Sequence, residues 1–348
     1  MRMIFNINYI ITIFIVKLGG FTMNLNRAKW KIVYACILAL LLVGCGHNEA
    51  KTSSQDESPS QQQVEHVTES RTLTDALGNE VEVPVHPERV IASYLEDHLV
   101  ALGITPVAQW SVRDGTSVQD YLQDALNEVP TIPYDLPFEA VQSFQPDLII
   151  MDSAAMVEGD KYAQYNNIAP TYVIGTEVNN DWRDELLRVG EVFDQKDKAQ
   201  QVLDIYNAKV KEAQQHIYYH VGNSSAAAVW VVGGKFFIVS QNLSSGDVMY
   251  NDLGLTVPAV VQEISAHATA NWNEISLEKL VTLDADHLFI IESGDDASVK
   301  ALSEKLWGAI PAVQAGNVHK VPKNSSWLYT GAIANTKIVD DIVDALTK

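Results

Sequence analysis

The clearest periodic pattern in the chain lies near its middle, between residues 181 and 220. Apolar residues recur there at steps of three and four: Ala199, Val202, Leu203, Tyr206, Val210, Ala213 and Ile217. This spacing places one apolar stripe along an α-helix whose other faces are Lys, Gln, Asp and Glu. A helix over about residues 197–218 would be roughly 33 Å long at ~1.5 Å per residue. We therefore predict a helical spine, 181–220, that is long enough to contact two domains at once.

Short apolar runs alternate with helical patterns on both sides of this spine. Strand-like runs precede it at 90–91, 106–110, 129–135 and 146–152, and follow it at 226–232, 235–240, 286–291 and 318–322. Helical patterns lie between them, at 94–104, 117–126, 137–144, 244–255, 274–283 and 298–307, and the chain ends in another. Such alternation predicts an α/β fold, with a parallel sheet covered on both faces in the first half. We expect an N-terminal lobe over 70–180 and a C-terminal lobe over 221–348.

The charge of the 348-residue chain is unevenly spread. Its formal net charge is −20, yet residues 1–44 hold five basic residues and no acidic one. The remainder is therefore strongly acidic, with 19 basic against 44 acidic side chains. A surface of this charge excludes nucleic-acid binding.

The basic start of the chain has the parts of an export signal. From Met23, which could be the true start, a basic segment leads into an apolar run, Ile32 to Val43, and then Gly44 and Cys45. This end resembles the lipobox of bacterial lipoproteins, which implies that Cys45 is lipidated and that residues 1–44 are removed. The alternative is a membrane-spanning helix, but the run is shorter than the ~20 apolar residues that a span needs. Residues 45–69, rich in Ser, Gln, Glu and Asp, are then a tether.

The ends of the predicted strands of the first lobe indicate where a ligand would bind. In open parallel sheets ligands sit beyond the carboxyl ends of the strands. Four segments reach this edge: 94–96, 110–113, 134–137 and 152–153.

Several stretches resemble, in order and spacing, the substrate-binding proteins of iron–siderophore and cobalamin importers of the ATP-binding-cassette class. They are ERVIAS, ALGITPVA and QPDLII in the first half, and NDLGLTVP, WNEISLEKLVTLDADHLFII and SSWLYTGAIANTKIVDDIV in the second. The resemblance covers nearly everything from residue 70 onward. It implies two Rossmann-like lobes joined by a long interlobe helix, with the ligand cleft between them. It also implies a lipid-anchored, monomeric receptor at the extracellular face of the cell membrane, as in Gram-positive bacteria. This receptor would deliver a ferric siderophore to permease subunits driven by a cytoplasmic ATPase.

The resemblance also assigns a docking role to one acid on each lobe. The helix-start glutamates that match the family's permease contacts are Glu139 and Glu278. The alternative is a favourable charge at a helix N-terminus, worth about 0.3–1 kcal/mol.

Cationic and aromatic side chains near the cleft edge are the candidates for ligand contact. Two guanidiniums, Arg113 and Arg183, would suit a ligand with carboxylates or an anionic iron chelate, although either could be a surface charge. A large flat chelate also needs apolar walls, although many aromatic residues belong to cores. The predicted ligand-binding residues are Tyr94, Trp110, Arg113, Arg183, Lys235, Phe236, Trp272, Trp327 and Tyr329, with Trp110 and Trp327 as the preferred pair.

The small number of cations favours a hydroxamate or mixed citrate–hydroxamate chelate over a triply anionic catecholate. Haem or cobalamin is the alternative ligand, and we expect no cofactor and no metal site. The pair His216 and His220 has the i, i+4 spacing of a zinc site, but more simply lies at the exposed end of the spine. An enzyme is a rival class, although the chain has no nucleophile elbow, phosphate-binding loop or His-Glu-x-x-His motif. A surface-anchored adhesin or scaffold is a third possibility.

Overall fold

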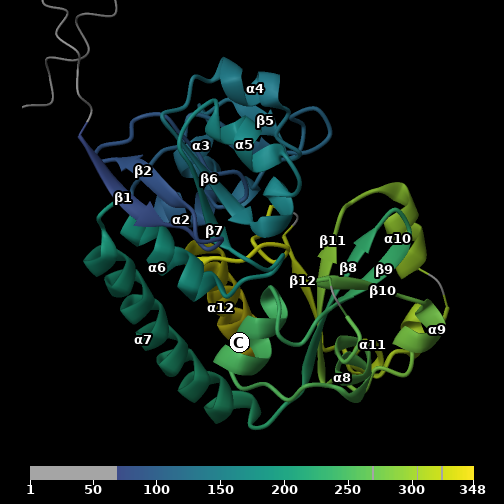
Figure 1. Cartoon of the computed structure of the whole chain (residues 1–348). Coiled ribbons are helices and arrows are strands. Elements are labelled where there is room, and N and C mark those ends of the chain that lie inside the picture. Colours follow the sequence, from purple (N-terminus) through teal and green to yellow (C-terminus); the bar gives the residue numbers. More distant parts are fainter. Residues whose placement is uncertain (1–68, 269, 304, 323) are drawn as a thin grey trace, which may run out of the picture. The chain divides into compact units, whose positions relative to one another are not determined.

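A computed structural model describes residues 69–268, 270–303, 305–322 and 324–348 (Figure 1). These residues belong to one unit of the chain, His66–Lys348. The predicted export signal, Cys45 and nearly all of the predicted tether lie outside the described residues.

The N-terminal lobe is built on short parallel strands. Its central sheet has the order β3-β6-β7, and a separate parallel pair is formed by β4 and β5. The strands are β3 (Val90–Ile91), β4 (Gln109–Ser111), β5 (Thr131–Pro133), β6 (Leu148–Ser153) and β7 (Thr171–Gly175), preceded by the antiparallel hairpin β1 (Ser70–Thr74) and β2 (Glu80–Pro84). The prediction of parallel strands is confirmed, but the single predicted sheet is divided. Pro130 and Pro133 lack the N–H groups that a longer central strand would need at β5.

Helices connect these strands as the sequence predicts. They are α2 (Glu96–Ala101), η2 (Asp120–Leu122), α3 (Gln123–Leu126), α4 (Phe138–Ser143), η3 (Ala154–Val157) and α5 (Lys161–Asn166). The helices predicted at 94–104, 117–126 and 137–144 are confirmed in position, and each is shorter than its pattern. Strand β7 and helix α5 were not predicted.

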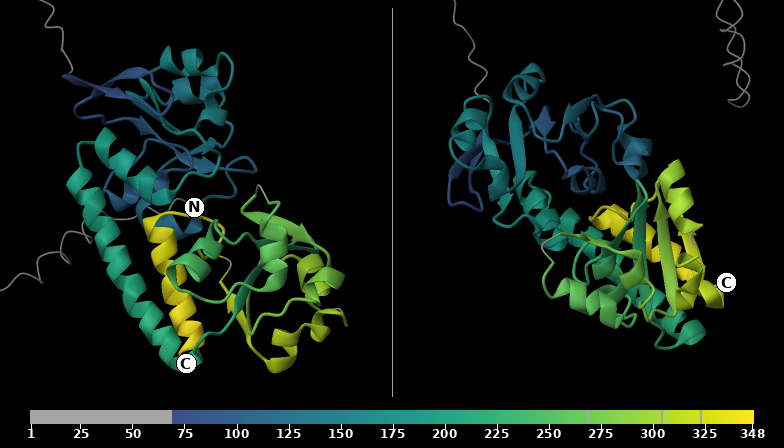
Figure 2. Two further views of the ribbon diagram at one scale, coloured as in Figure 1. Left: turned by 60° about the horizontal axis from the view of Figure 1, so that its bottom comes forward. Right: turned by 90° about the vertical axis from the view of Figure 1, so that its right-hand side faces the viewer.

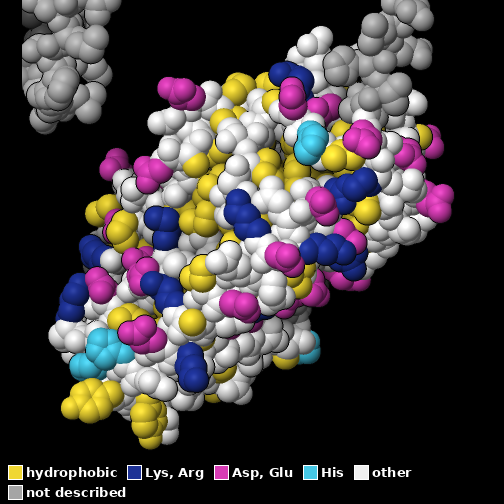
Figure 3. Space-filling model, turned by 90° about the vertical axis from the view of Figure 1, so that its left-hand side faces the viewer, with side chains coloured by type: hydrophobic (Ala, Val, Ile, Leu, Met, Phe, Trp, Pro, Cys, Tyr) yellow, Lys and Arg dark blue, Asp and Glu magenta, His cyan; other side chains and the backbone are white. Residues whose placement is uncertain are grey.

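The predicted spine forms two helices, α6 (Trp182–Val192) and α7 (Lys196–Val221). Helix α7 has 26 residues and is therefore about 39 Å long. Its predicted apolar stripe is buried, apart from the half-buried Val202. The opposite side of α7 lies on a face where acidic and basic side chains are interspersed (Figure 3). Helix α7 is thus stabilised by packing along one stripe, as its sequence predicts.

The C-terminal lobe contains a five-stranded mixed sheet in the order β10-β9-β8-β11-β12. Its strands are labelled in Figure 1. Its strands are β8 (Ala226–Val232), β9 (Lys235–Val239), β10 (Trp272–Ile275), β11 (His287–Glu292) and β12 (Val318–Val321). Strands β8, β11 and β12 are parallel, whereas β9 and β10 are antiparallel to their neighbours. Gly233 and Gly234, with φ of 58° and 78°, form the tight turn that reverses the chain between β8 and β9.

The helices of this lobe are short, except for the last. They are the π-helix η4 (Asp247–Asp252), α8 (Ala259–Ser265), α9 (Leu277–Leu280), α10 (Asp296–Leu302), η5 (Trp307–Ala309), α11 (Pro311–Ala315) and α12 (Ala332–Leu346). The helices predicted at 244–255, 274–283 and 298–307 are present in part. Residues 274–275 end β10 instead, because they pair with β9.

The C-terminal helix α12 ties the N-terminal lobe to the rest of the chain. It packs against α7 and against α2 of the N-terminal lobe (Figure 2). The buried carboxylate of Asp97 on α2 accepts hydrogen bonds from the backbone N–H groups of Ile333 (3.0 Å) and Ala334 (2.9 Å), in the first turn of α12. Gly331, with φ of 135°, precedes this turn, and a Cβ there would lie 2.3 Å from Asp97 Cγ. A carboxylate from one lobe therefore caps a helix that follows the other lobe in sequence.

We predict that Gly331→Ala lowers the free energy of unfolding by about 2 kcal/mol or more, because the added methyl group displaces the Asp97 carboxylate and the backbone conformation disfavours alanine. Urea denaturation measures this change. Gly308→Ala is the matched control, because a Cβ at Gly308 meets no atom within 4 Å. Equal stability of the two variants would contradict the proposed constraint.

Candidate ligand-binding site

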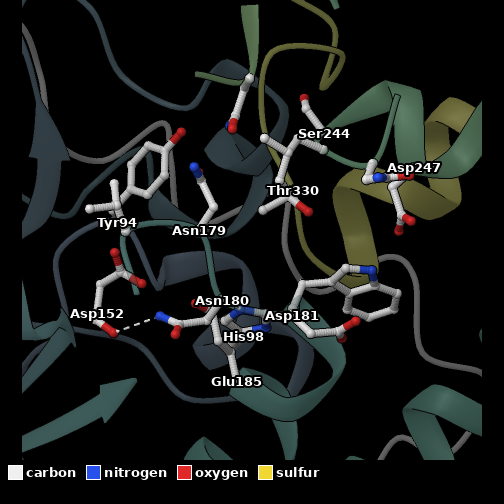
Figure 4. Close-up of a pocket in the computed structure, with 15 residues that line it drawn as sticks. Tyr94, His98, Asp152, Asn179, Asn180, Asp181, Glu185, Ser244, Asp247 and Thr330 are labelled. Atoms are coloured by element: carbon white, nitrogen blue, oxygen red, sulfur yellow. Dashed lines mark hydrogen bonds and ion pairs between the residues drawn. The ribbon is translucent and has the colours of Figure 1, made fainter. Parts of the chain in front are cut away.

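A small cavity lies where the two lobes and the start of α6 meet (Figure 4). The N-terminal lobe contributes residues from α2 and the end of β6, and the C-terminal lobe contributes the segments around η4, β10 and α12. Its volume is about 80 Å³, well below the ~300–1,000 Å³ of common ligand pockets. The lining residues are Tyr94, His98, Asp152, Val178, Asn179, Asn180, Asp181, Trp182, Glu185, Asn242, Leu243, Ser244, Asp247, Asn271 and Thr330.

Three consecutive ionisable residues of α2 are buried and reach three different elements. Glu96 accepts the backbone N–H of Trp110 on β4 at 2.6 Å, and Asp97 caps α12. His98 Nε2 lies 3.1 Å from Glu185 Oε2 on α6. Burial raises the pKa of Glu96 to about 7 and lowers the pKa of His98 below its ordinary value. Helix α2 therefore fixes the position of β4, α6 and α12 around the cavity.

Two carboxyl groups on the N-terminal side of the cavity, Asp152 and Glu185, have raised pKa values. Burial raises the pKa of Asp152 to about 8, and the neighbouring charge of Glu185 raises it further. Burial also raises the pKa of Glu185 to about 7, while its hydrogen bond to Asp152 opposes the shift. Protonated Asp152 can thus donate to ionised Glu185, which leaves one negative charge on the pair near neutral pH.

The loop between β7 and α6 is held against this pair. The side-chain amide of Asn180 donates to the backbone carbonyl groups of Asp152 (3.2 Å) and Glu177 (2.9 Å). Gly175 allows this approach, because a Cβ at that position would lie 2.2 Å from the Asn180 amide. The loop therefore presents its polar side chains at a fixed place beside the carboxyl ends of β6 and β7.

An aromatic cluster forms a wall next to the cavity. The ring centroids of Tyr94 and Trp110 are 5.4 Å apart, and that of Tyr329 lies 6.4 Å from Tyr94 and 6.3 Å from Trp110. Tyr121 packs behind Tyr329 at 5.4 Å. Tyr94 is 36% exposed and has φ of 70°, a strained conformation for an aromatic residue. The structure thus brings together three of the predicted ligand-binding residues, and contact with ligand remains a prediction for each.

The two predicted guanidiniums do not lie in the cavity. Arg183 forms ion pairs with Asp247 (3.1 Å), at the rim of the cavity, and with Asp252 (2.6 Å), behind the cavity. Its guanidinium also packs on the Trp182 ring, 4.6 Å from the ring centroid. Arg113 is exposed in a turn after β4 and does not line the cavity. Local carboxylates thus pair with Arg183, and a left-handed turn places Arg113 outside the cavity. Contact of these two cations with ligand stays a prediction.

Four further predicted contacts also lie away from the cavity lining. Trp327 is fully buried, stacks on Phe289 at 4.8 Å and donates its indole N–H to Asp341. Phe236 is buried in the core against Trp307. The structure therefore gives Trp327 and Phe236 packing roles in the core, and their contact with ligand stays an untested prediction.

The remaining two side chains belong to the paired strands β9 and β10 of the C-terminal sheet. Lys235 is exposed and pairs with Glu274 at 2.9 Å. Trp272 is half-buried beside Trp230 on the same sheet. Neither lines the cavity, so the structure gives neither of them a place at the candidate site.

The two predicted docking acids are exposed on separate lobes. Glu139 lies in the first turn of α4 and Glu278 in the first turn of α9 (Figure 1). Neither lines the cavity, as predicted, and the docking role itself remains a prediction.

Within the described residues, no group of three or more His, Cys, Asp and Glu side chains is placed to hold a metal ion. His216 and His220 lie at the exposed end of α7, with ring centroids 4.6 Å apart. In the described part of the chain, no helix combines the length and apolar character needed to cross a membrane.

Comparison with known proteins places this architecture in a family. Residues 90–325 match the model of the family described as periplasmic binding protein. The chain belongs to this family. Members of the family bind substrates, which confirms the prediction of a binding protein over an enzyme.

Individual relatives share this architecture over most of their length. The iron(3+)-hydroxamate-binding protein YxeB of Bacillus subtilis is 26% identical over 332 residues, which are 92% of this chain and 98% of YxeB. Staphylococcus aureus SirA complexed with staphyloferrin B matches with a TM-score of 0.66 and 23% identity, over 80% of this chain and 98% of SirA. FhuD2 from Staphylococcus aureus with bound ferrioxamine B matches with a TM-score of 0.63 and 21% identity, over 74% of this chain and 98% of FhuD2. The predicted fold of two lobes joined by a long helix is confirmed.

We predict that thermal stability falls as the pH rises from 6 to 9. Glu96, Asp152 and Glu185 have raised pKa values in the folded state, so the native protein binds more protons than the unfolded chain. The stability that they contribute is complete below about pH 4, the ordinary range of carboxyl groups, and is lost as the pH rises through about 7 to 8.

Scanning calorimetry at several pH values tests this dependence. Glu96→Gln should reduce the fall in melting temperature by a few degrees, because an amide oxygen still accepts the Trp110 N–H and the amide does not ionise. Glu88→Gln, at an exposed position, should leave it unchanged. A slope that is equal in all three proteins would remove Glu96 as a cause.

Proposed function

We propose that this protein is a receptor that binds a ferric siderophore between its lobes and delivers it to the permease of an ATP-binding-cassette importer. Membership of the periplasmic binding protein family supports a transport role. The similarity to YxeB, an iron(3+)-hydroxamate-binding protein, and to the FhuD2 and SirA complexes with ferrioxamine B and staphyloferrin B supports an iron chelate as the ligand.

The observation that carries this proposal is the aromatic wall of Tyr94, Trp110 and Tyr329 beside a polar cavity. A ferric chelate is a large, partly apolar body, and such ligands need apolar walls with a few placed polar groups. The wall contains residues from both sides of the cleft. Tyr94 follows β3 and Trp110 lies in β4, whereas Tyr329 precedes α12. The cavity is too small for the whole chelate, so the iron core rests on the wall and only a side group enters.

The charge of the lining favours a hydroxamate chelate. A ferric ion with three hydroxamates is neutral, whereas a tris-catecholate carries three negative charges. No Lys or Arg side chain lines the cavity, and Asp152, Glu185 and Asp247 do. A triply anionic ligand would be repelled there, and a mixed citrate–hydroxamate chelate is the second choice.

The location that we propose is the outer face of the cell membrane. Lipidation of Cys45 would anchor the receptor, and the tether that follows would hold it near the permease. A lipid chain and a flexible tether restrict the receptor to the membrane surface and raise its effective concentration there.

We predict that Trp110→Leu and Tyr329→Leu each weaken binding of a neutral ferric trihydroxamate about tenfold or more, because each removes part of the aromatic wall. Isothermal titration calorimetry on the full chain in mild detergent measures the affinity. Tyr219→Leu is the control, since Tyr219 is 84% exposed in the last turn of α7. Wild-type affinity in both wall variants would reject this binding surface.

We predict that the double variant Glu139→Arg, Glu278→Arg binds chelate normally but fails to stimulate ATP hydrolysis by the reconstituted importer. Exposed charges act mainly on partner choice and association rate, so reversal of both should impair docking. Glu212→Arg, an exposed glutamate on α7, serves as the matched charge reversal. Normal stimulation by the double variant would show that the two glutamates are not needed for docking and act only as favourable charges at helix N-termini.

A further inference from the structure

The cavity beside the aromatic wall is lined mainly by polar side chains, and the charged ones among the described residues are all acids. Four of its residues are carboxylic acids, and none is a lysine or an arginine: the acids are Asp152, Asp181, Glu185 and Asp247. They come from both sides of the cavity, with Asp152 and Glu185 opposite Asp247 (Figure 4). The nearest guanidinium, Arg183, is held by Asp247 and Asp252 and pairs weakly with Asp181 at 3.7 Å. The acids outnumber the positive charges, so the cavity has a negative potential.

A second observation points to a hydrogen-bond donor as the missing partner. His98 lines the cavity, its side chain is 2% exposed, and its Nδ1 atom has no hydrogen-bond partner among the described residues. Its Nε2 atom faces the Glu185 carboxylate at 3.1 Å and therefore carries the proton. The neutral ring thus leaves the lone pair of Nδ1 as a buried acceptor without a donor. A buried acceptor of this kind is unfavourable unless a ligand satisfies it.

We propose that this cavity binds a primary ammonium group on a side arm of the siderophore while the aromatic wall holds the ferric hydroxamate core. This inference rests on the proposed function and narrows its substrate to hydroxamate chelates that carry a free amine.

The size and chemistry of the cavity fit this group. A volume of about 80 Å³ accepts an ammonium and a few methylene groups, but not a chelated iron centre. An ammonium has three donors and no acceptor, which suits the four acids, the imidazole lone pair of His98 and the Oδ1 of Asn271, which has no partner among the described residues. The lining also holds one donor without a partner in the described part of the chain, the indole N–H of Trp182. Tyr94 both lines the cavity and belongs to the aromatic wall, so the side arm and the iron core can bind at the same time.

The test compares three ferric chelates on the full chain in mild detergent by isothermal titration calorimetry. They are a linear trihydroxamate with a terminal primary amine, the same chelate with that amine acetylated, and a neutral cyclic trihydroxamate. We expect the amine chelate to bind at least tenfold more tightly than its acetylated form. Asp152→Asn and Glu185→Gln should each reduce this ratio several-fold, and Asp184→Asn, an exposed neighbour on α6, should leave it unchanged.

The outcomes separate the ammonium site from the siderophore-binding function on which it rests. Equal affinity of wild-type protein for the amine chelate and its acetylated form would overturn the ammonium site and leave siderophore binding intact. Failure to bind any of the three chelates would overturn the proposed function itself. The ratio of the wild-type affinities for the amine chelate and its acetylated form is enough to test the inference. A variant that fails to fold therefore does not obscure the result.

Discussion

The architecture around the cleft depends on three adjacent ionisable side chains buried on the short helix α2. Glu96 receives the N–H of Trp110, Asp97 caps the first turn of α12, and His98 meets Glu185 on α6. Each interaction joins α2 to a different element, so a helix of six residues holds a strand, the C-terminal helix and the start of the connecting segment. Removal of one partner would leave a charge or donor buried without compensation, which is far more costly than loss of an exposed pair.

The same burial that makes α2 a junction gives the cleft its chemistry. Because Asp152 and Glu185 lie close together out of water, the pKa of each is raised, while burial lowers the pKa of His98 and leaves its Nδ1 without a partner among the described residues. Glu96 holds β4 at the place where Trp110 meets Tyr94 and Tyr329. A polar cavity and an apolar wall thus adjoin one another through residues of the same short stretch, 94–98.

Several predicted ligand contacts lie outside the cavity for one physical reason. Arg183 and Trp327 are residues of the right type in segments that do border the cleft. The guanidinium of Arg183 pairs with carboxylates of η4 and packs on the ring of Trp182. The indole of Trp327 packs in the core against Phe289. A side chain binds a ligand only if its own neighbours leave it free, and those neighbours are distant in sequence. Of the acids that line the cavity, only Asp152 had a signal of its own, from its place at the end of a predicted strand, in a chain with 44 acidic residues.

Local patterns in the sequence predict most of the elements and their order, although not β7 or α5. The stripe from Ala199 to Ile217 predicts α7 because helical periodicity is a local property, and the alternating runs predict the strands and helices of both lobes. The carboxyl ends of β3 and β6 likewise placed Tyr94 and Asp152 at the ligand edge. Only the tertiary structure decided how the N-terminal sheet divides, that Asp97 caps α12 across 236 residues, and that the cavity is lined by acids. These features arise from contacts between distant segments, and the free energy of such a contact depends on burial and on partners that no local pattern contains.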